Sequence, residues 1–182
     1  LITTLFQLRS KTFVDFMVSR HNCETKNVKH HLQHLQRGDV ILYDRLYCSL
    51  SVLALHARRG IEAVFRVKTK GTLREIVKFV ESGQREAFVE INRPGVQVRL
   101  RLIRATIRKK PYFFATTLLD EKKYPLTALV SLYRERWQIE VAFKHCKRSL
   151  GLEYLRAKTT TTLRQEIGAV FLSYQLARVT EF

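Results

Sequence analysis

Apolar residues recur along the chain with two spacings, one typical of strands and one typical of helices. Residues 1–8 and 12–18 have strand-like spacing, and the polar link Arg9-Ser10-Lys11 joins them, which predicts a β-hairpin. Residues 25–36 have apolar side chains at i, i+4 and i+7, which predicts a helix that ends before Gly38.

The next stretch predicts a strand, a helix and a second strand. Residues 40–43 form a continuous apolar run of strand length, which suits a buried central strand of an α/β sheet. Residues 49–59 have helical spacing and are followed by Gly60, and residues 61–67 alternate as a strand. This order favours a parallel strand pair joined by a crossover helix.

Residues 68–119 predict a short helix and then a region rich in strands. The sequence Thr72-x-x-Glu75 is typical of a capping box, and Gly83 would end that helix. Alternation along residues 96–107 slips by one place near Leu102, which predicts a β-bulge. The arginines of this region either follow phosphates or occupy a solvated outer face; they are Arg99, Arg101, Arg104 and Arg108. Residues 112–119 predict a more buried strand.

The last third of the chain is predicted to be helical. Pro125 suits a first helical position, and neither Gly nor Pro follows before Gly151, so one long helix is expected. Thr162-x-x-Gln165 would cap a last helix. Its predicted buried stripe consists of Leu163, Ile167, Val170, Phe171 and Tyr174.

Composition and charge narrow the class of protein. The chain has 182 residues and is 46% hydrophobic, which is typical of a globular domain. Its 33 Lys+Arg against 16 Asp+Glu give a net charge of +17, which favours a polyanion partner, nucleic acid before a membrane surface. No apolar run is long enough to span a membrane. With three Cys, no CxxC and no signal peptide, we expect a cytoplasmic protein without a zinc ribbon or disulfide framework.

Four polar residues share one stripe of the predicted long helix. At about 100° per residue, Tyr133, Arg136, Glu140 and Lys147 fall within roughly 60° of one another, beside an apolar stripe. A half-sheltered carboxylate can hold a metal ion, and neighbouring cations can bind phosphates. The alternative is a solvated helix face on which Arg136 and Glu140 form an incidental i,i+4 pair.

This stripe carries a resemblance to a known family. The spacing Tyr133-x2-Arg136-x3-Glu140-x6-Lys147, within LYRERWQIEVAFKHCKRSLGLEYLRAKT, resembles the Y-R-E-K signature of insertion-sequence DDE transposases of the fourth insertion-sequence family. The resemblance implies that Glu140 is the last carboxylate of a metal-binding Asp-Asp-Glu triad. It also implies that Tyr133, Arg136 and Lys147, with Trp137 of the Arg-Trp pair, contact transposon-end DNA.

Asp44 is the candidate for the second carboxylate of that triad. It follows the strand at 40–43, at the end where open α/β sheets place their ligand sites. The sequence Asp44-Arg45 resembles the family's second-Asp block, which implies a DNA-binding role for Arg45, but Leu46 stands where Gly is usual. A strand-end Asp that caps the next turn is the alternative, and Asp39 lies at the opposite end of the strand.

Two other groups of possible ligands are given less weight. Asp15 lies inside the second strand of the hairpin, and its neighbours resemble the family's third strand, so a structural role is favoured. His30 and His34 have metal-ligand spacing, but no Glu lies between them as in a metalloprotease helix, so histidines exposed near DNA are favoured. No first Asp is therefore assigned, and we expect a truncated catalytic domain that does not cut DNA alone.

The resemblance implies an α/β fold: an RNase H-like mixed sheet flanked by helices. It also implies a β-rich insertion, about residues 68–111, between the second Asp and the Glu within one domain of residues 1–182. Asp44 and Glu140 would bind Mg²⁺ or Mn²⁺, the partner would be DNA, and two copies would form a synaptic homodimer in a bacterial or archaeal nucleoid. A nucleic-acid-binding module without catalysis is the alternative. A hydrolase of small phosphoesters would leave the charge of +17 unexplained.

Overall fold

The computed structural model describes residues 1–19 and 24–180, which belong to two compact units. Unit 1 takes its residues from both ends of the sequence, Leu1–Cys23 and Arg134–Phe182, and unit 2 is the stretch Glu24–Tyr133. No helix among the described residues is long and apolar enough to cross a membrane.

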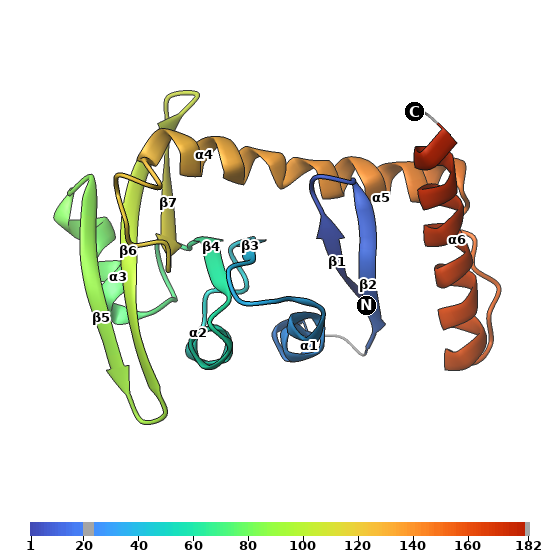
Figure 1. Cartoon of the computed structure of the whole chain (residues 1–182), viewed down its shortest axis with the longest axis horizontal. Helices are drawn as coiled ribbons and strands as arrows, with labels where there is room; N and C mark the ends of the chain where they lie inside the picture. The colour runs from blue at the N-terminus through green and yellow to red at the C-terminus, as the bar shows by residue number, and fades with distance from the viewer. Residues whose placement is uncertain (20–23, 181–182) are drawn as a thin grey trace. The chain divides into compact units, whose positions relative to one another are not determined.

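Unit 2 is built on one mixed sheet of five strands (Figure 1). Across the sheet the strands are β3 (Val40–Tyr43), β4 (Glu62–Arg66), β7 (Lys110–Thr116), β6 (Val96–Ile107) and β5 (Glu86–Arg93). The β3–β4 pair is parallel and the other pairs are antiparallel. The predicted mixed α/β architecture is therefore confirmed.

The predicted crossover between β3 and β4 is confirmed, and its helix is α2 (Leu50–Arg59). The Ser49 hydroxyl accepts a hydrogen bond from the Val52 amide at 3.4 Å and caps the helix N-terminus. Gly60 ends the helix at φ 62°, a left-handed conformation that glycine adopts without a Cβ penalty. These two caps fix the length of the connection that brings β4 alongside β3.

The sheet of unit 2 separates two apolar clusters. Tyr43 and Phe65 belong to the cluster that also contains buried residues of α1 (Glu24–His31), α2 and α3 (Arg74–Ser82). The other cluster contains Leu129 and Tyr133 of α4 (Leu126–Glu135), together with residues Val64, Ile103 and Phe114 of β4, β6 and β7. Helices thus cover the sheet on both faces.

The position of β3 corrects one expectation. It is an end strand of the five-stranded sheet of the described residues, not a central one, and Val40 is 36% exposed. Its apolar run has another cause: Ile41 and Tyr43 pack on one cluster and Leu42 on the other. An end strand covered on both faces has the same sequence pattern as a central strand.

The β-bulge predicted near Leu102 is wrong. β6 pairs residue for residue with β5 and with β7 through this point; Leu102 lies opposite Ala87 on one side and Ala115 on the other. Alternation fails because consecutive residues of β6, from Leu100 to Ile103, are buried on both faces of the sheet.

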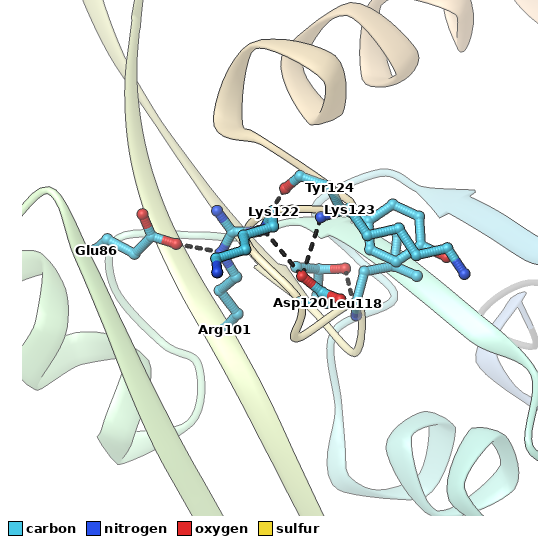
Figure 2. A network of polar contacts seen from close by, with 8 residues as sticks. Glu86, Arg101, Leu118, Asp120, Lys122, Lys123 and Tyr124 are labelled. Carbon is cyan, nitrogen blue, oxygen red and sulfur yellow. Dashed lines mark hydrogen bonds and ion pairs between the residues drawn. The ribbon is translucent and has the colours of Figure 1, made fainter.

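Arg101 is one of those buried residues and is only 1% exposed. Its Nε pairs with the Glu86 carboxylate on β5, and its Nη1 donates to the Tyr124 carbonyl at 2.6 Å (Figure 2). Arg101 therefore lies neither on a solvated outer face nor where it can follow phosphates. It joins β5 and β6 to the segment that enters α4.

Two predicted capping boxes are not formed. At α3 the N-cap is Leu73, whose apolar side chain forms no cap hydrogen bond, and the Glu75 carboxylate pairs with Arg93 on β5 at 2.5 Å. At α6 (Thr160–Thr180) the hydroxyl of Thr159 accepts from the Thr162 amide at 3.2 Å, so the helix begins earlier than predicted. The predicted stripe of α6 is confirmed, with Ile167, Phe171 and Tyr174 buried.

The predicted long helix is interrupted at Arg136, between α4 and α5 (Trp137–Ser149). Arg136 keeps helical backbone angles, φ −51° and ψ −28°, and its carbonyl accepts from the Ile139 amide at 3.3 Å. The interruption is a local change of hydrogen bonding of the 3₁₀ type.

Unit 1 contains the predicted hairpin, β1 (Ile2–Gln7) and β2 (Thr12–Val18), with a register shift between Leu5 and Phe6. Its core is aromatic: the ring of Phe13 stacks on that of Phe171, with centroids 4.1 Å apart. The buried residues of this core are Phe13, Ala142, Cys146, Leu152, Ile167, Phe171 and Tyr174. Strands near the start of the chain and helices near its end thus share one core.

Candidate active site

Asp44 lies immediately after β3, at the carboxyl end of the parallel pair. Tyr43 lies opposite Phe65 in the register, so Asp44 and Arg66, the last residue of β4, lie at the same edge of the sheet. The Asp44 backbone carbonyl accepts from the Tyr47 amide at 3.2 Å, which holds the turn despite the departure at Leu46. The Asp44 side chain is therefore held at the sheet edge by backbone pairing.

One carboxylate oxygen of Asp44 has no hydrogen-bond partner. Its Oδ1 is buried and accepts no hydrogen bond from any described residue. A buried acceptor without a donor costs on the order of 1–3 kcal/mol, more for a charged group. A hard cation would satisfy this oxygen, because Mg²⁺ and similar ions prefer carboxylate ligands. The residue thus fits a divalent-metal site.

A buried polar pair anchors the strand just before Asp44. The Tyr43 hydroxyl lies 2.9 Å from Nε2 of His56, and Nδ1 of His56 lies 2.8 Å from the Ile61 carbonyl. Since a carbonyl only accepts, the proton is on Nδ1, and Tyr43 donates to Nε2. Burial lowers the pKa of His56 and raises the pKa of Tyr43, so both groups are neutral at pH 7. The pair joins β3 to α2.

Asp44 lines a concavity of about 610 Å³ at this edge of unit 2. The other polar lining residues come from three segments: Arg45 after β3, Arg66 and the turn after β4, and the start of β7. They are mostly basic, namely Arg45, Arg66, Lys68 and Lys70, and Tyr112 adds an aromatic ring. Four cations and one carboxylate give this concavity a positive charge.

Glu140 lies on α5 in unit 1. Its Oε1 is 2.5 Å from Nη2 of Arg136, and its side chain is 40% exposed. With Lys147 it lines a second concavity, of about 510 Å³, where Lys147 Nζ is 4.0 Å from the Glu153 carboxylate. The predicted Glu140 and Lys147 thus lie on α5, Arg136 directly precedes this helix, and Lys144 and Arg148 add positive charge beside Glu140 and Lys147.

The remaining predicted DNA-binding residues have different environments. Tyr133 is only 7% exposed, and its ring packs edge-on against Phe114 in the core of unit 2, with centroids 4.9 Å apart. Trp137 is 62% exposed, and Arg45 is exposed beside Asp44. Asp44 belongs to unit 2 and Glu140 to unit 1, so their convergence remains a prediction.

The less favoured ligand candidates lie on regular elements. Asp15 is within β2, opposite Leu5. His30 ends α1 with His31, and His34 ends the following 3₁₀ turn, with the rings of His30 and His34 5.7 Å apart.

Several residues of the first concavity were not among those predicted from the sequence. Lys68 and Lys70 follow the strand at 61–67, so the predicted parallel pair already placed them at the edge that carries Asp44. Tyr112 could not be placed in the same way. It comes from β7, and the pairing of β7 with β4 leaves no trace in the local pattern.

Comparison with known proteins identifies the family of the chain. The Transposase DDE domain family matches residues 2–176, and the chain belongs to this family. Transposase InsG for insertion sequence element IS4 of Escherichia coli (strain K12) is 30% identical over 86 residues, which are 46% of this chain and 20% of that protein. The transposase for insertion sequence element IS421 of Escherichia coli is 41% identical over 74 residues, 40% and 20% of the two chains. The predicted resemblance to insertion-sequence DDE transposases is confirmed.

A solved structure shares the fold. The chain in the cryo-EM structure of the piggyBac transposase synaptic complex with hairpin DNA matches 98% of this chain with a TM-score of 0.57 and 12% identity, and 47% of that chain is covered. The predicted RNase H-like fold is consistent with this likeness. The present chain spans less than half the length of the curated relatives that it matches.

Proposed function

We propose that this chain contributes Asp44 and Glu140 to a catalytic site that cleaves and joins DNA strands at transposon ends. The unsatisfied, buried Oδ1 of Asp44 is the observation that carries the proposal. An uncompensated carboxylate oxygen at a sheet edge is costly unless a ligand satisfies it. The family of the chain makes DNA transposition the reaction to test.

The proposed site takes Mg²⁺ or Mn²⁺, which Asp44 and Glu140 would hold through carboxylate oxygens. Such ions stabilise charge on a reacting phosphate and increase the nucleophilicity of a bound oxygen. The protein's own cations complement them: Arg45 is exposed beside Asp44, and Arg136 orients the Glu140 carboxylate at 2.5 Å. Arg136 and Lys147 are also proposed to bind phosphate oxygens.

Transposon-end DNA is the proposed substrate, and the exposed Trp137 is proposed to contact it. The net charge of +17 supports a polyanionic partner. Synapsis of two ends would bring two copies of the protein together. With two assigned carboxylates, Asp44 and Glu140, we expect the 182 residues alone to bind metal but not to cut DNA, because a two-ion site uses further ligands.

Titration of Mn²⁺ into the protein by calorimetry tests the metal site directly. Asp44→Asn and Glu140→Gln should each weaken Mn²⁺ binding at least tenfold, because each removes one charged oxygen ligand. Glu121→Gln is the matched control, since Glu121 is exposed and lines neither concavity.

Two outcomes would contradict the proposal. Unchanged Mn²⁺ affinity in Asp44→Asn would show that Asp44 is not a ligand. Salt-sensitive DNA binding without any Mn²⁺ binding would favour a nucleic-acid-binding module without catalysis.

A further inference from the structure

Four cations line the concavity at Asp44, and Asp44 is the one carboxylate among its lining residues. Arg45, Arg66, Lys68 and Lys70 line the same concavity as Asp44. None of the four forms an ion pair with a carboxylate among the described residues. Like charges held this close repel one another, so the arrangement favours an anionic ligand.

Arg66 is held in place for such a ligand. Its guanidinium lies over the ring of Tyr112, with 4.5 Å between Cζ and the ring centroid. The backbone beneath it is fixed, because Arg66 pairs with Phe114 across β4 and β7, and the Val67 amide donates to the Phe113 carbonyl at 2.9 Å. Cation–π stacking leaves the edge of the guanidinium, with its N–H donors, available to an acceptor.

Lys68 and Lys70 extend the positive surface beyond the sheet. Both are exposed and lie on the turn that follows β4, on either side of Thr69. A lysine side chain is a flexible point charge, suited to phosphates whose positions vary, whereas Arg66 is fixed. The basic side chains therefore extend from the Asp44 edge of the sheet onto the segment that follows β4.

We propose that Arg66, Lys68 and Lys70 form a groove that binds the DNA backbone. The groove holds the phosphates that lie beside the reacting phosphate at Asp44. The proposal rests on the proposed function, because Asp44 defines which phosphate reacts. The groove would bind independently of base sequence, since its contacts are to phosphate oxygens. It would add affinity without supplying a metal ligand.

The test uses the salt dependence of DNA binding in EDTA, measured by fluorescence anisotropy with a labelled mixed-sequence duplex. Each neutralised phosphate contributes about −0.9 to the slope of log K against log salt concentration. The double variant Lys68→Gln/Lys70→Gln should reduce the magnitude of the slope by about 2. Lys78→Gln/Lys122→Gln makes the same charge change at exposed lysines outside the concavity and should keep the wild-type slope.

A second measurement does not depend on the folding of a variant. Acetylation of lysines in the wild-type protein, read by mass spectrometry, should be slower at Lys68 and Lys70 when DNA is bound, and unchanged at Lys78 and Lys122. Equal protection from acetylation at all four lysines would contradict the proposed groove.

The failure of this inference can be told apart from the failure of the proposed function. If the wild type binds DNA and the Lys68/Lys70 variant keeps its slope, the groove is wrong while the metal site is unaffected. If the wild type binds no DNA at any salt concentration, both are wrong.

Discussion

The Tyr43 hydroxyl donates to Nε2 of His56 at 2.9 Å, one residue before the candidate metal ligand Asp44. Both side chains are buried, and the Tyr43 ring also stacks on Phe65, with centroids 4.8 Å apart. The end of β3 is thus fixed by one polar and one apolar contact.

Removing the Tyr43 hydroxyl should destabilise unit 2. Tyr43→Phe leaves Nε2 of His56 buried without a donor, and the expected loss is about 1–3 kcal/mol of unfolding free energy. Hydrogen exchange of β3 and β4 in urea measures this loss in unit 2 itself. Tyr154→Phe, at a residue that is 77% exposed, should change stability little. An equal effect of both variants would contradict the importance of the buried bond.

The same pair predicts a pH dependence. Burial lowers the pKa of His56 in the folded state below its ordinary value of about 6.5. The unfolded chain therefore takes up the proton first as pH falls, so this contribution to stability is complete above about pH 6.5 and is lost as pH falls through the folded pKa. His56→Gln should flatten the stability profile between about pH 7 and pH 5, measured by urea unfolding. If the pH profile of stability is as steep in the variant as in the wild type, the titrating group is not His56.

Asp44→Asn should stabilise the metal-free protein. The substitution removes a charge whose Oδ1 is buried without a donor, and functional sites commonly cost stability in this way. We expect a gain of about 1 kcal/mol in unfolding free energy without metal. The stabilisation of the wild type by added Mn²⁺ should disappear in the variant. A loss of stability in EDTA would mean that the carboxylate has a structural partner.

Arg101 should be the most sensitive arginine of the β-rich region. Arg101→Met removes the partner of Glu86 and the donor to the Tyr124 carbonyl, and we expect a loss of about 3 kcal/mol. Arg99→Met is a close control on the same strand, because Arg99 is exposed over the Phe88 ring. It should cost less than about 1 kcal/mol. Similar losses in the two variants, measured by urea unfolding, would contradict the buried role of Arg101.

The local sequence pattern predicted those elements of the fold whose ends are marked by capping residues. The β3–α2–β4 crossover was predictable because Ser49 and Gly60 mark both ends of the helix. The burial of Arg101 was not, because β6 is covered on both faces and residues buried on both faces do not alternate. The interruption at Arg136 was also unpredictable, since neither Gly nor Pro marks it.

The part of the candidate site that depends on the end of a single strand was predictable. Asp44 follows from a strand end together with the family resemblance. The cations beside it depend on sheet order: Arg66 and Tyr112 meet because β7 runs antiparallel to β4, a pairing of residues about 50 positions apart. Tyr133 belonged by spacing to the polar stripe, yet packing against Phe114 placed it in a core. Helical spacing predicts on which side of a helix a residue lies, but it does not predict which residue of another element packs against it.

Unit 1 is made from the two ends of the sequence, whereas unit 2 is one uninterrupted stretch. During synthesis the whole of unit 2 leaves the ribosome before α6, which supplies the Phe171 ring that stacks on Phe13. Unit 2 can thus fold on the nascent chain, while the first hairpin keeps its aromatic side chains unburied until α6 has been synthesised. A ribosome that stalls before α6 would present a folded unit 2 and a first hairpin with exposed aromatic side chains, the kind of species that chaperones bind and that aggregates when they are scarce.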